Sequence, residues 1–214
     1  MIYSGIYTDE NGVERTIQIT NDDSVEAMKN DYEELIRKYD PHRVKIIRTL
    51  TNPGEALHLK VTVSAPSHYL TSQDDTIPKA CTSMTVDIVC YPGYPLRGIR
   101  AFYPSDHFLA SPNVFRSGGA CIDHWIPLKS SLITVTDKLV RDMIHDPLVT
   151  RYDSLANPSM VQWHKDGVAE GRFPTIDPGE LYAPEIPLLP QRRKTDRKKG
   201  APPLPKRRER RTLW

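Results

Sequence analysis

Apolar residues alternate with polar residues along residues 57–63 and again along residues 84–90. This period of two places one face of a strand against a core and the other face in water. Shorter β-rich runs at residues 44–47 and 97–103 bring the number of predicted strands to four. Because short links join strands that follow one another along the chain, the pattern predicts an antiparallel meander.

A second spacing, with apolar residues three and four positions apart, predicts two amphipathic helices. The first covers residues 24–39, where Asp23 begins a capping-box pattern. The second covers residues 131–145. An Asp-Pro pair follows each helix, Asp40-Pro41 and Asp146-Pro147, and the residue before a proline is disfavoured in helical conformation.

The stretch between the fourth strand and the second helix, residues 104–131, has few apolar residues and many turn formers. Long irregular segments within a compact domain often carry function. After the second helix we expect a short third one, with Asn157 as its N-cap, Pro158 at its first position and Gly167 as its terminator.

The two ends of the chain differ from the middle. Residues 1–21 predict a hairpin extension, because two β-rich runs flank an Asn-Gly pair, a strong turn signal. Residues 174–214 are rich in proline and then in basic residues. Such a composition buries too little apolar surface to fold, so we expect a disordered tail. Residues 22–173 remain as the core domain, which we assign to the α+β class.

The positive charge belongs to the tail. Between Pro190 and Trp214 there are 11 Lys and Arg residues and 2 Asp and Glu residues, whereas the rest of the chain has 18 basic and 25 acidic residues. The tail could therefore bind nucleic acid, an acidic partner or a membrane surface, or could act only to keep the protein in solution. The folded part gives no reason to expect nucleic-acid binding.

The chain has three cysteines and no Cys-x-x-Cys pair. This count argues against a disulfide framework, and we expect a reducing, cytoplasmic compartment. The first residues do not have the pattern of a secretory signal, and no apolar run is long enough for a membrane span. No Cys/His set has zinc-ligand spacing, so we expect no metal and no cofactor.

Cys121 is the candidate nucleophile. It follows Gly118 and Gly119 in a predicted loop, where a partner chain could approach closely. A half-buried structural thiol is the alternative from local context. Cys90, by contrast, falls on the apolar face of a predicted strand and is expected to be a small buried hydrophobic residue.

Several motifs around Cys121 resemble those of ubiquitin-conjugating enzymes. The similar segments are Tyr94-Pro95-Leu96, Ser111-Pro112-Asn113, Gly119-Ala120-Cys121-Ile122-Asp123, Trp125-Ile126-Pro127 and the stretch from Asp153 to Pro158. The family places its cysteine eight residues after the asparagine of its His-Pro-Asn motif, and Cys121 lies eight residues after Asn113. The motifs and the predicted elements occur in the same order as in the family over residues 22–165. The resemblance implies a ubiquitin-conjugating-enzyme-like fold.

The resemblance also implies an activity. Cys121 would accept a ubiquitin-like modifier as a thioester from a modifier-activating enzyme and pass it to a target amine. Asn113 would stabilise the oxyanion through its side-chain amide or brace the loop, and Asp153 would orient the attacking amine and take up its proton. Ser111 stands where the family has histidine, so the loop has to be braced in another way. This divergence is closer to prokaryotic members of the family, some of them linked to phage defence.

Partner surfaces follow from the same resemblance. Leu96, Ile126 and Pro127 correspond to the loops by which the family meets ligases, with core packing as the alternative. Lys29 and Arg37 lie on the helix face that meets the activating enzyme, with a solvated helix face as the alternative.

Three other functions remain open from sequence. The chain could be a non-catalytic conjugation scaffold, although such variants of the family lack the cysteine. It could be a partner-binding module that acts through its basic tail. Finally, His124 could pair with Cys121 in a hydrolase, because a base and a nucleophile need only be close in space.

Overall fold

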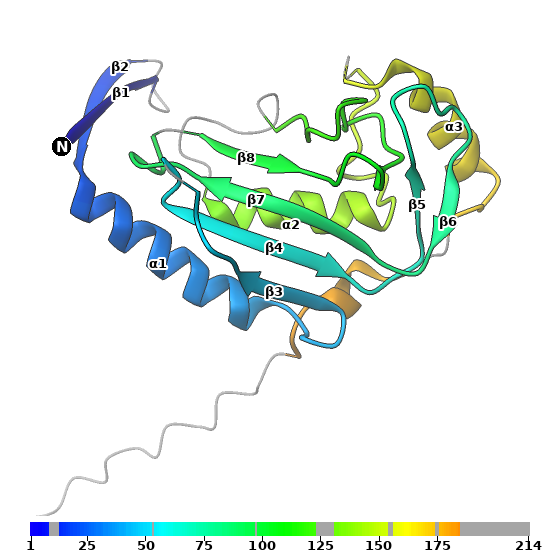
Figure 1. Ribbon diagram of the computed structural model, residues 1–214, viewed down its shortest axis with the longest axis horizontal. Helices are drawn as coiled ribbons and strands as arrows, with labels where there is room; N and C mark the ends of the chain where they lie inside the picture. The colour runs from blue at the N-terminus through cyan, green and yellow to red at the C-terminus, as the bar shows by residue number, and fades with distance from the viewer. Residues whose placement is uncertain are drawn as a thin grey trace, which may run out of the picture. The chain divides into compact units, whose positions relative to one another are not determined.

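Four antiparallel strands form the main sheet of the protein in the computed structural model (Figure 1). In sheet order they are β3 (Val44–Arg48), β4 (Leu57–Val63), β7 (Met84–Cys90) and β8 (Ile99–Phe102). The alternation in sequence determines which face is buried: every second residue of β4 is buried, whereas those between them are exposed or half-buried. The predicted meander is confirmed.

The structure describes residues 1–8, 13–52, 54–96, 98–122, 131–153, 156–173 and 176–184. Helices and antiparallel sheets occur together in this part of the chain, in agreement with the predicted α+β class. None of the helices described is long and apolar enough to cross a membrane.

A second, three-stranded sheet was not predicted. It consists of β5 (Ser67–Leu70) between β6 (Lys79–Cys81) and β9 (Phe108–Leu109). β9 comes from the segment that we expected to be irregular throughout, so that expectation was wrong at this point. Three consecutive apolar residues of the segment, Phe108, Leu109 and Ala110, are all fully buried, and their burial fixes the local backbone.

Helix α1 (Asn21–Lys38) begins earlier than predicted. Its N-cap is Thr20, whose side chain accepts a hydrogen bond from the Asp23 amide, while the Asp23 carboxylate accepts one from the Thr20 amide. Asp23 is therefore the acidic partner in a capping box and not its first residue. Among the apolar residues whose spacing predicted this helix, Met28 and Leu35 are buried within it, whereas Val25 is exposed.

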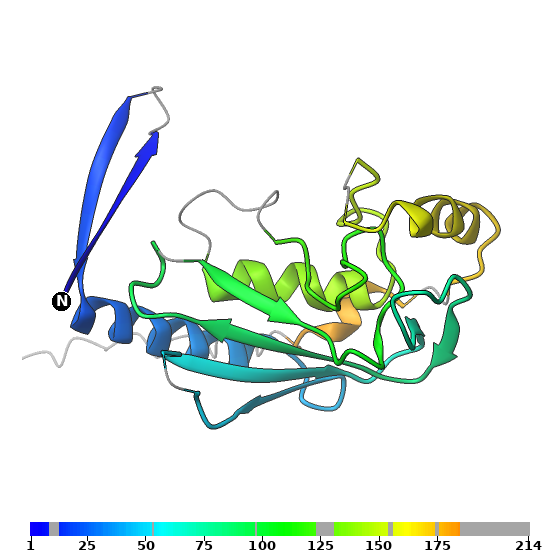
Figure 2. The ribbon, with the colours of Figure 1, turned by 45° about the horizontal axis from the view of Figure 1, so that its top comes forward.

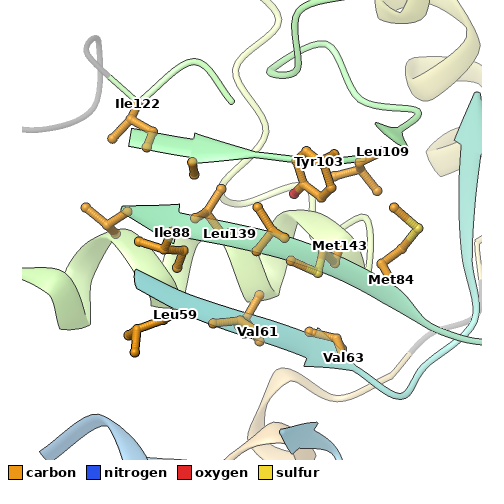
Figure 3. Close-up of a cluster of buried hydrophobic side chains, with 14 of the residues drawn as sticks. Leu59, Val61, Val63, Met84, Ile88, Tyr103, Leu109, Ile122, Leu139 and Met143 are labelled. Atoms are coloured by element: carbon orange, nitrogen blue, oxygen red, sulfur yellow. The ribbon is translucent and has the colours of Figure 1, made fainter. Parts of the chain in front are cut away.

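Helix α2 (Leu132–Met143) lies across one face of the main sheet (Figure 1). Ser131 caps it by accepting a hydrogen bond from the Thr134 amide. Figure 3 shows side chains of α2, such as Leu139, meeting those of β4, β7 and the segments after β8. Each fully buried aliphatic side chain in this core contributes about 1.5–3 kcal/mol.

Helix α3 (Pro158–Ala169) begins with proline, as predicted, but it does not end at Gly167. A Cβ atom at position 167 would lie 2.4 Å from the ring of Phe173, so this glycine makes room for an aromatic contact. Gly171, with a φ of +64°, follows the helix instead.

The N-terminal hairpin pairs β1 (Ile2–Thr8) with β2 (Glu14–Thr20) along their whole length. The predicted Asn-Gly turn lies outside the described residues. β2 runs directly into α1 (Figure 2), and the Asn21 amide donates to the Met1 carbonyl at 3.0 Å. The predicted hairpin is thus joined to the first helix without an intervening linker.

The boundary predicted at residue 173 was too early. A short 3₁₀ helix (Pro178–Leu181) follows it, and Leu181 is fully buried. Tyr182 pairs with Tyr39 at the end of α1, and the two rings stack with centroids 5.5 Å apart. The folded unit therefore extends to Pro184, because two apolar residues in a proline-rich stretch have a place in the core.

Candidate functional site

The segment that carries Cys121 folds back on itself. Val114 and Ala120 form an antiparallel bridge, and the Cys121 amide donates a hydrogen bond to the Asn113 carbonyl at 2.8 Å. Gly118 makes the turn between them, with a φ of +85° and with the Tyr103 carbonyl oxygen 2.8 Å from where a Cβ atom would be. Only glycine fits that position without strain. The turn therefore brings Cys121 next to Asn113.

Cys121 lies at the margin of the core. Its exposed fraction is 7 %, less than its place after a glycine-rich turn predicts. Its neighbour Ile122 belongs to the hydrophobic cluster, which draws the backbone inward. The sulfur interacts electrostatically with the guanidinium of Arg151. A cationic side chain, itself paired with Asp153, thus acts electrostatically on the candidate nucleophile.

The other two cysteines have different surroundings. Cys90 is fully buried on β7, as the alternation predicts, and burial raises the pKa of its thiol to about 12. Cys81 is half-buried on β6, and burial raises the pKa of its thiol as well. A thiol with a raised pKa is a poor nucleophile at neutral pH because the thiolate is the reactive form.

The side chain of Asn113 is almost completely buried and is held at both ends of its amide. Its Oδ1 accepts a hydrogen bond from the Arg151 amide at 3.2 Å, and its Nδ2 lies 3.5 Å from Oδ1 of Asp142. These contacts brace the loop. The role of this amide in stabilising an oxyanion remains a prediction.

Ser111 braces the loop at the position where histidine was expected from the resemblance. Its hydroxyl lies 2.9 and 3.0 Å from the two carboxyl oxygens of Asp142 and accepts a hydrogen bond from the Asn113 amide at 3.1 Å. All three residues are buried. A serine paired with a buried aspartate from α2 therefore holds this turn.

Asp153 lies on the loop that Asn113 holds. Its carboxylate accepts hydrogen bonds from Arg151, at 3.0 Å from Nε and 2.6 Å from Nη2, and its side chain is mostly exposed. Arg151 therefore connects Asp153 to the surroundings of Cys121. The role of Asp153 towards an amine remains a prediction.

Sequence reasoning missed two residues of this site, Arg151 and Asp142. Arg151 belongs to no recognisable motif. Asp142 interrupts the apolar face of a predicted helix, next to Met143, and a charged residue at such a position was the only available signal.

The turn containing Tyr94 and Leu96 lies at the other end of α2. The Tyr94–Pro95 peptide bond is cis. The Tyr94 hydroxyl donates to Asp31 of α1 and accepts from the Leu132 amide at 2.6 Å. Leu96 is half-buried, and its amide donates to the Gly93 carbonyl. Because one network ties this turn to both helices, Leu96 has a defined position.

The other predicted partner residues fall into two groups. Lys29 and Arg37 are exposed on α1, where Lys29 pairs weakly with Glu33 at 3.9 Å and Arg37 donates to the Glu33 carbonyl. Their exposure is compatible with both alternatives, a helix face that meets the activating enzyme and a helix face that is merely solvated. Ile126 and Pro127, together with His124 of the hydrolase alternative, lie outside the described residues.

His68, His145 and His164 pack together around Phe173. His145, with a φ of 57°, lies 3.2 Å from His68 between ring nitrogens and stacks on Phe173. Burial lowers the pKa of His145 far below its ordinary value and that of His164 to about 4. Across the residues that the structure describes, no group of three potential ligands could hold a metal ion.

The sequence matches no known family model and no curated protein. The site must therefore be interpreted from its own residues and contacts.

Proposed function

We propose that the chain is a conjugating enzyme for a ubiquitin-like modifier, with Cys121 as the thioester-forming residue and with a ubiquitin-conjugating-type fold. The order of elements supports the fold: a helix, a four-stranded meander, a turn carrying the cysteine and two further helices. The expected partners are the modifier, its activating enzyme, and a ligase or target protein.

One observation carries the proposal. Three candidate residues from separate motifs gather at one place: the Cys121 amide is bonded to the Asn113 carbonyl, the Asn113 side chain to the Arg151 amide, and the Arg151 side chain to Asp153. The Asn157 amide also donates to the Pro112 carbonyl at 3.1 Å, so the motif at residues 153–158 meets the motif at residues 111–113. Hydrogen bonds thus connect the segments that carry these motifs, which supports the proposal.

The chemistry has two steps. In the first, the Cys121 thiolate attacks the carbonyl carbon of the modifier's thioester; a new C–S bond forms, the C–S bond to the activating enzyme breaks, and the cysteine of that enzyme leaves as a thiolate. In the second, an amine attacks the same carbon, a C–N bond forms, and the Cys121 sulfur leaves and takes up the proton that the amine loses. Sulfur suits both steps as a nucleophile and as a leaving group.

The charges of the site fit these steps. Each attack places negative charge on the carbonyl oxygen and then on the departing sulfur. The Arg151 guanidinium is a fixed cation that interacts electrostatically with Cys121, and a preorganised cation of this kind stabilises negative charge that develops during the reaction. Asp153 keeps the guanidinium in position through two hydrogen bonds.

The experiment incubates the protein with ATP and with each of a panel of ubiquitin-like modifiers and their activating enzymes. We expect a covalent adduct that a thiol reductant removes. Cys121→Ser should give an adduct that resists the reductant, because an ester replaces the thioester, and Cys121→Ala should give none. Cys81→Ala is the matched control and should behave as the unchanged protein does.

Two further variants separate the alternatives. A chain without residues 190–214 should still form the adduct, whereas a module that acts only through its basic tail would lose its activity. His124→Ala should also leave adduct formation unchanged. In a Cys-His hydrolase, by contrast, the same substitution would remove the base and abolish activity. An adduct that persists in Cys121→Ala would overturn the proposal.

A further inference from the structure

Asp142 is a buried carboxyl for which the proposed chemistry has no use. It lies on the last turn of α2, is 1 % exposed and has Met143 as its neighbour in the core. Burying a carboxyl group is costly unless hydrogen bonds compensate it. An apolar residue would suit helix packing better at this position, so the presence of aspartate needs another reason.

Its partners supply that reason. The carboxyl accepts from the Ser111 hydroxyl, at 2.9 and 3.0 Å from its two oxygens, and lies 3.5 Å from Nδ2 of Asn113. Both partners come from the turn that precedes the cysteine. The carboxyl therefore contacts the turn that precedes Cys121 through Ser111 and Asn113, the two side chains hydrogen-bonded to it among the described residues.

The contacts continue from this carboxyl to the cysteine. Ser111 accepts from the Asn113 amide at 3.1 Å, and the Asn113 carbonyl accepts from the Cys121 amide at 2.8 Å. The Asn113 side chain also holds the Arg151 amide. Both the strand that carries Cys121 and the loop that carries Arg151 are thus bonded to a turn that Asp142 holds.

The charged and ionisable groups around Asp142 do not neutralise it. Burial, and to a smaller extent the carboxylate of Asp146, raises its pKa to about 7, while the Ser111 and Asn113 hydrogen bonds act against this rise. Asp146 itself pairs with Arg141 at 2.6 Å. The buried hydroxyl of Tyr103 interacts electrostatically with Asp142 from the end of β8. No cation is among these neighbours in the part of the chain that the structure describes.

We propose that Asp142 is a positioning residue for Cys121: its carboxyl fixes the turn at residues 111–113 and, through that turn, the backbone of the cysteine. This inference rests on the proposed function for its catalytic consequence, but its structural part stands by itself. Asp142 does not touch the reacting atoms. It acts through Ser111 and Asn113.

The first test measures amide hydrogen exchange in the full chain, without any ligand. In Asp142→Ala we expect exchange in peptides covering residues 111–122 to rise by about tenfold or more, because local opening becomes easier. Exchange in β4 and β7 should stay unchanged. Asp142→Asn keeps the shape and one acceptor, and should restore most of the protection.

The matched control is Thr136→Val, on the same helix. Thr136 is also fully buried, and its hydroxyl has no hydrogen-bond partner among the described residues. This isosteric variant should leave exchange at residues 111–122 as it is. If Thr136→Val loosens that segment as much as Asp142→Ala does, general destabilisation of α2 explains the effect and the inference is overturned.

The second test asks whether Asp142 acts through Ser111. The probe is iodoacetamide, and the readout is the rate of Cys121 alkylation, followed by mass spectrometry between pH 6 and 9. Asp142→Ala and Ser111→Ala should change the rate in the same direction by several-fold, and the double variant should differ little from either one, since coupled residues are not additive. Fully additive effects would show that the two residues act separately.

The third test uses the modifier identified by the adduct experiment and compares adduct formation with amine transfer. Asp142→Ala should slow transfer by at least about tenfold, with normal transfer in Thr136→Val and partial rescue in Asp142→Asn. If the unchanged protein forms no adduct, the proposed function fails, whereas the exchange and alkylation tests still decide the positioning role. Normal exchange in a folded Asp142→Ala variant would overturn that role, whatever the activity.

Discussion

Helix α2 carries two aspartates, Asp137 and Asp142, in opposite electrostatic surroundings. Asp137 accepts from the Tyr182 hydroxyl at 2.7 Å and pairs with Lys38 at 2.8 Å. Its hydrogen bonds and the positive charge of Lys38 outweigh burial and lower its pKa. The donors to Asp142 in the described part of the chain are neutral, and burial raises its pKa to about 7.

The two carboxylates contribute to the fold in different ways. Asp137 forms a cluster with Lys38, Tyr39 and Tyr182. This cluster joins α1, α2 and the segment after the 3₁₀ helix through one ion pair and two tyrosine hydroxyls. A neutral residue in place of Asp137 would lose the ion pair with Lys38. Among the described residues no cation compensates the Asp142 carboxyl, which contacts the turn that precedes Cys121. A protein tolerates such a group more readily where it supports a specific geometry.

The two groups therefore respond to pH with opposite signs. Asp142 has a raised pKa in the folded state, so its stabilising contribution is complete below the unfolded value of 3.8 and is lost as the pH rises through about 7. Asp137 has a lowered pKa, so its contribution is complete above 3.8 and is lost only as the pH falls through the folded value.

The largest expected effect is the pH dependence of Asp142→Asn. Relative to this variant, the unchanged protein should lose on the order of 4 kcal/mol in free energy of unfolding between pH 4 and pH 8, because one pKa unit corresponds to about 1.4 kcal/mol. Urea denaturation at a series of pH values measures this. Two curves that run parallel over that range would show that the carboxyl is not buried in the way described.

A smaller effect is expected from Lys38→Met. The variant leaves the Asp137 carboxylate without its cation, and we expect a loss of about 2 kcal/mol at pH 7, between the values for exposed and buried ion pairs. The loss should disappear at acid pH, where Asp137 becomes protonated. Lys29→Met is the matched control, since its pair with Glu33 is exposed, and it should change thermal stability by no more than about 0.5 kcal/mol.

The smallest effects are expected from the two tyrosines that donate to Asp137, beginning with Tyr182→Phe. The variant removes the hydroxyl that donates to Asp137 but keeps the ring that stacks on Tyr39. Because a single hydrogen bond contributes about 1 kcal/mol, the free energy of unfolding, measured by thermal denaturation, should fall by that amount. Tyr39→Phe removes a longer contact, 3.3 Å, and should cost less. The reverse order would mean that the cluster is held mainly by Tyr39.

The main sheet could be predicted from the sequence because its strands alternate almost without interruption, as in Leu57 to Val63. The second sheet could not, because β9 has only two residues and depends on a distant partner, Tyr69 of β5. The end of the folded unit was missed for the same reason. Leu181 and Tyr182 have places in the structure that no local pattern indicates.

The candidate site was predictable only in part. The eight-residue spacing drew attention to Asn113 and Cys121, which are indeed hydrogen-bonded through their backbones. The inward orientation of the Asn113 side chain could not be foreseen, since it depends on Asp142 and Arg151 from later elements. Exposure of Cys121 was overestimated because burial of Ile122 is a tertiary effect.

The most direct test of Cys121 as the thioester carrier is peptide mapping of the charged protein by mass spectrometry. After reaction with the modifier, its activating enzyme and ATP at mildly acidic pH, the account predicts that the peptide containing Cys121 carries the modifier's C-terminal residues. Treatment with hydroxylamine should release them. Attachment to Cys81, or to a lysine with Cys121 unmodified throughout the time course, would contradict the account.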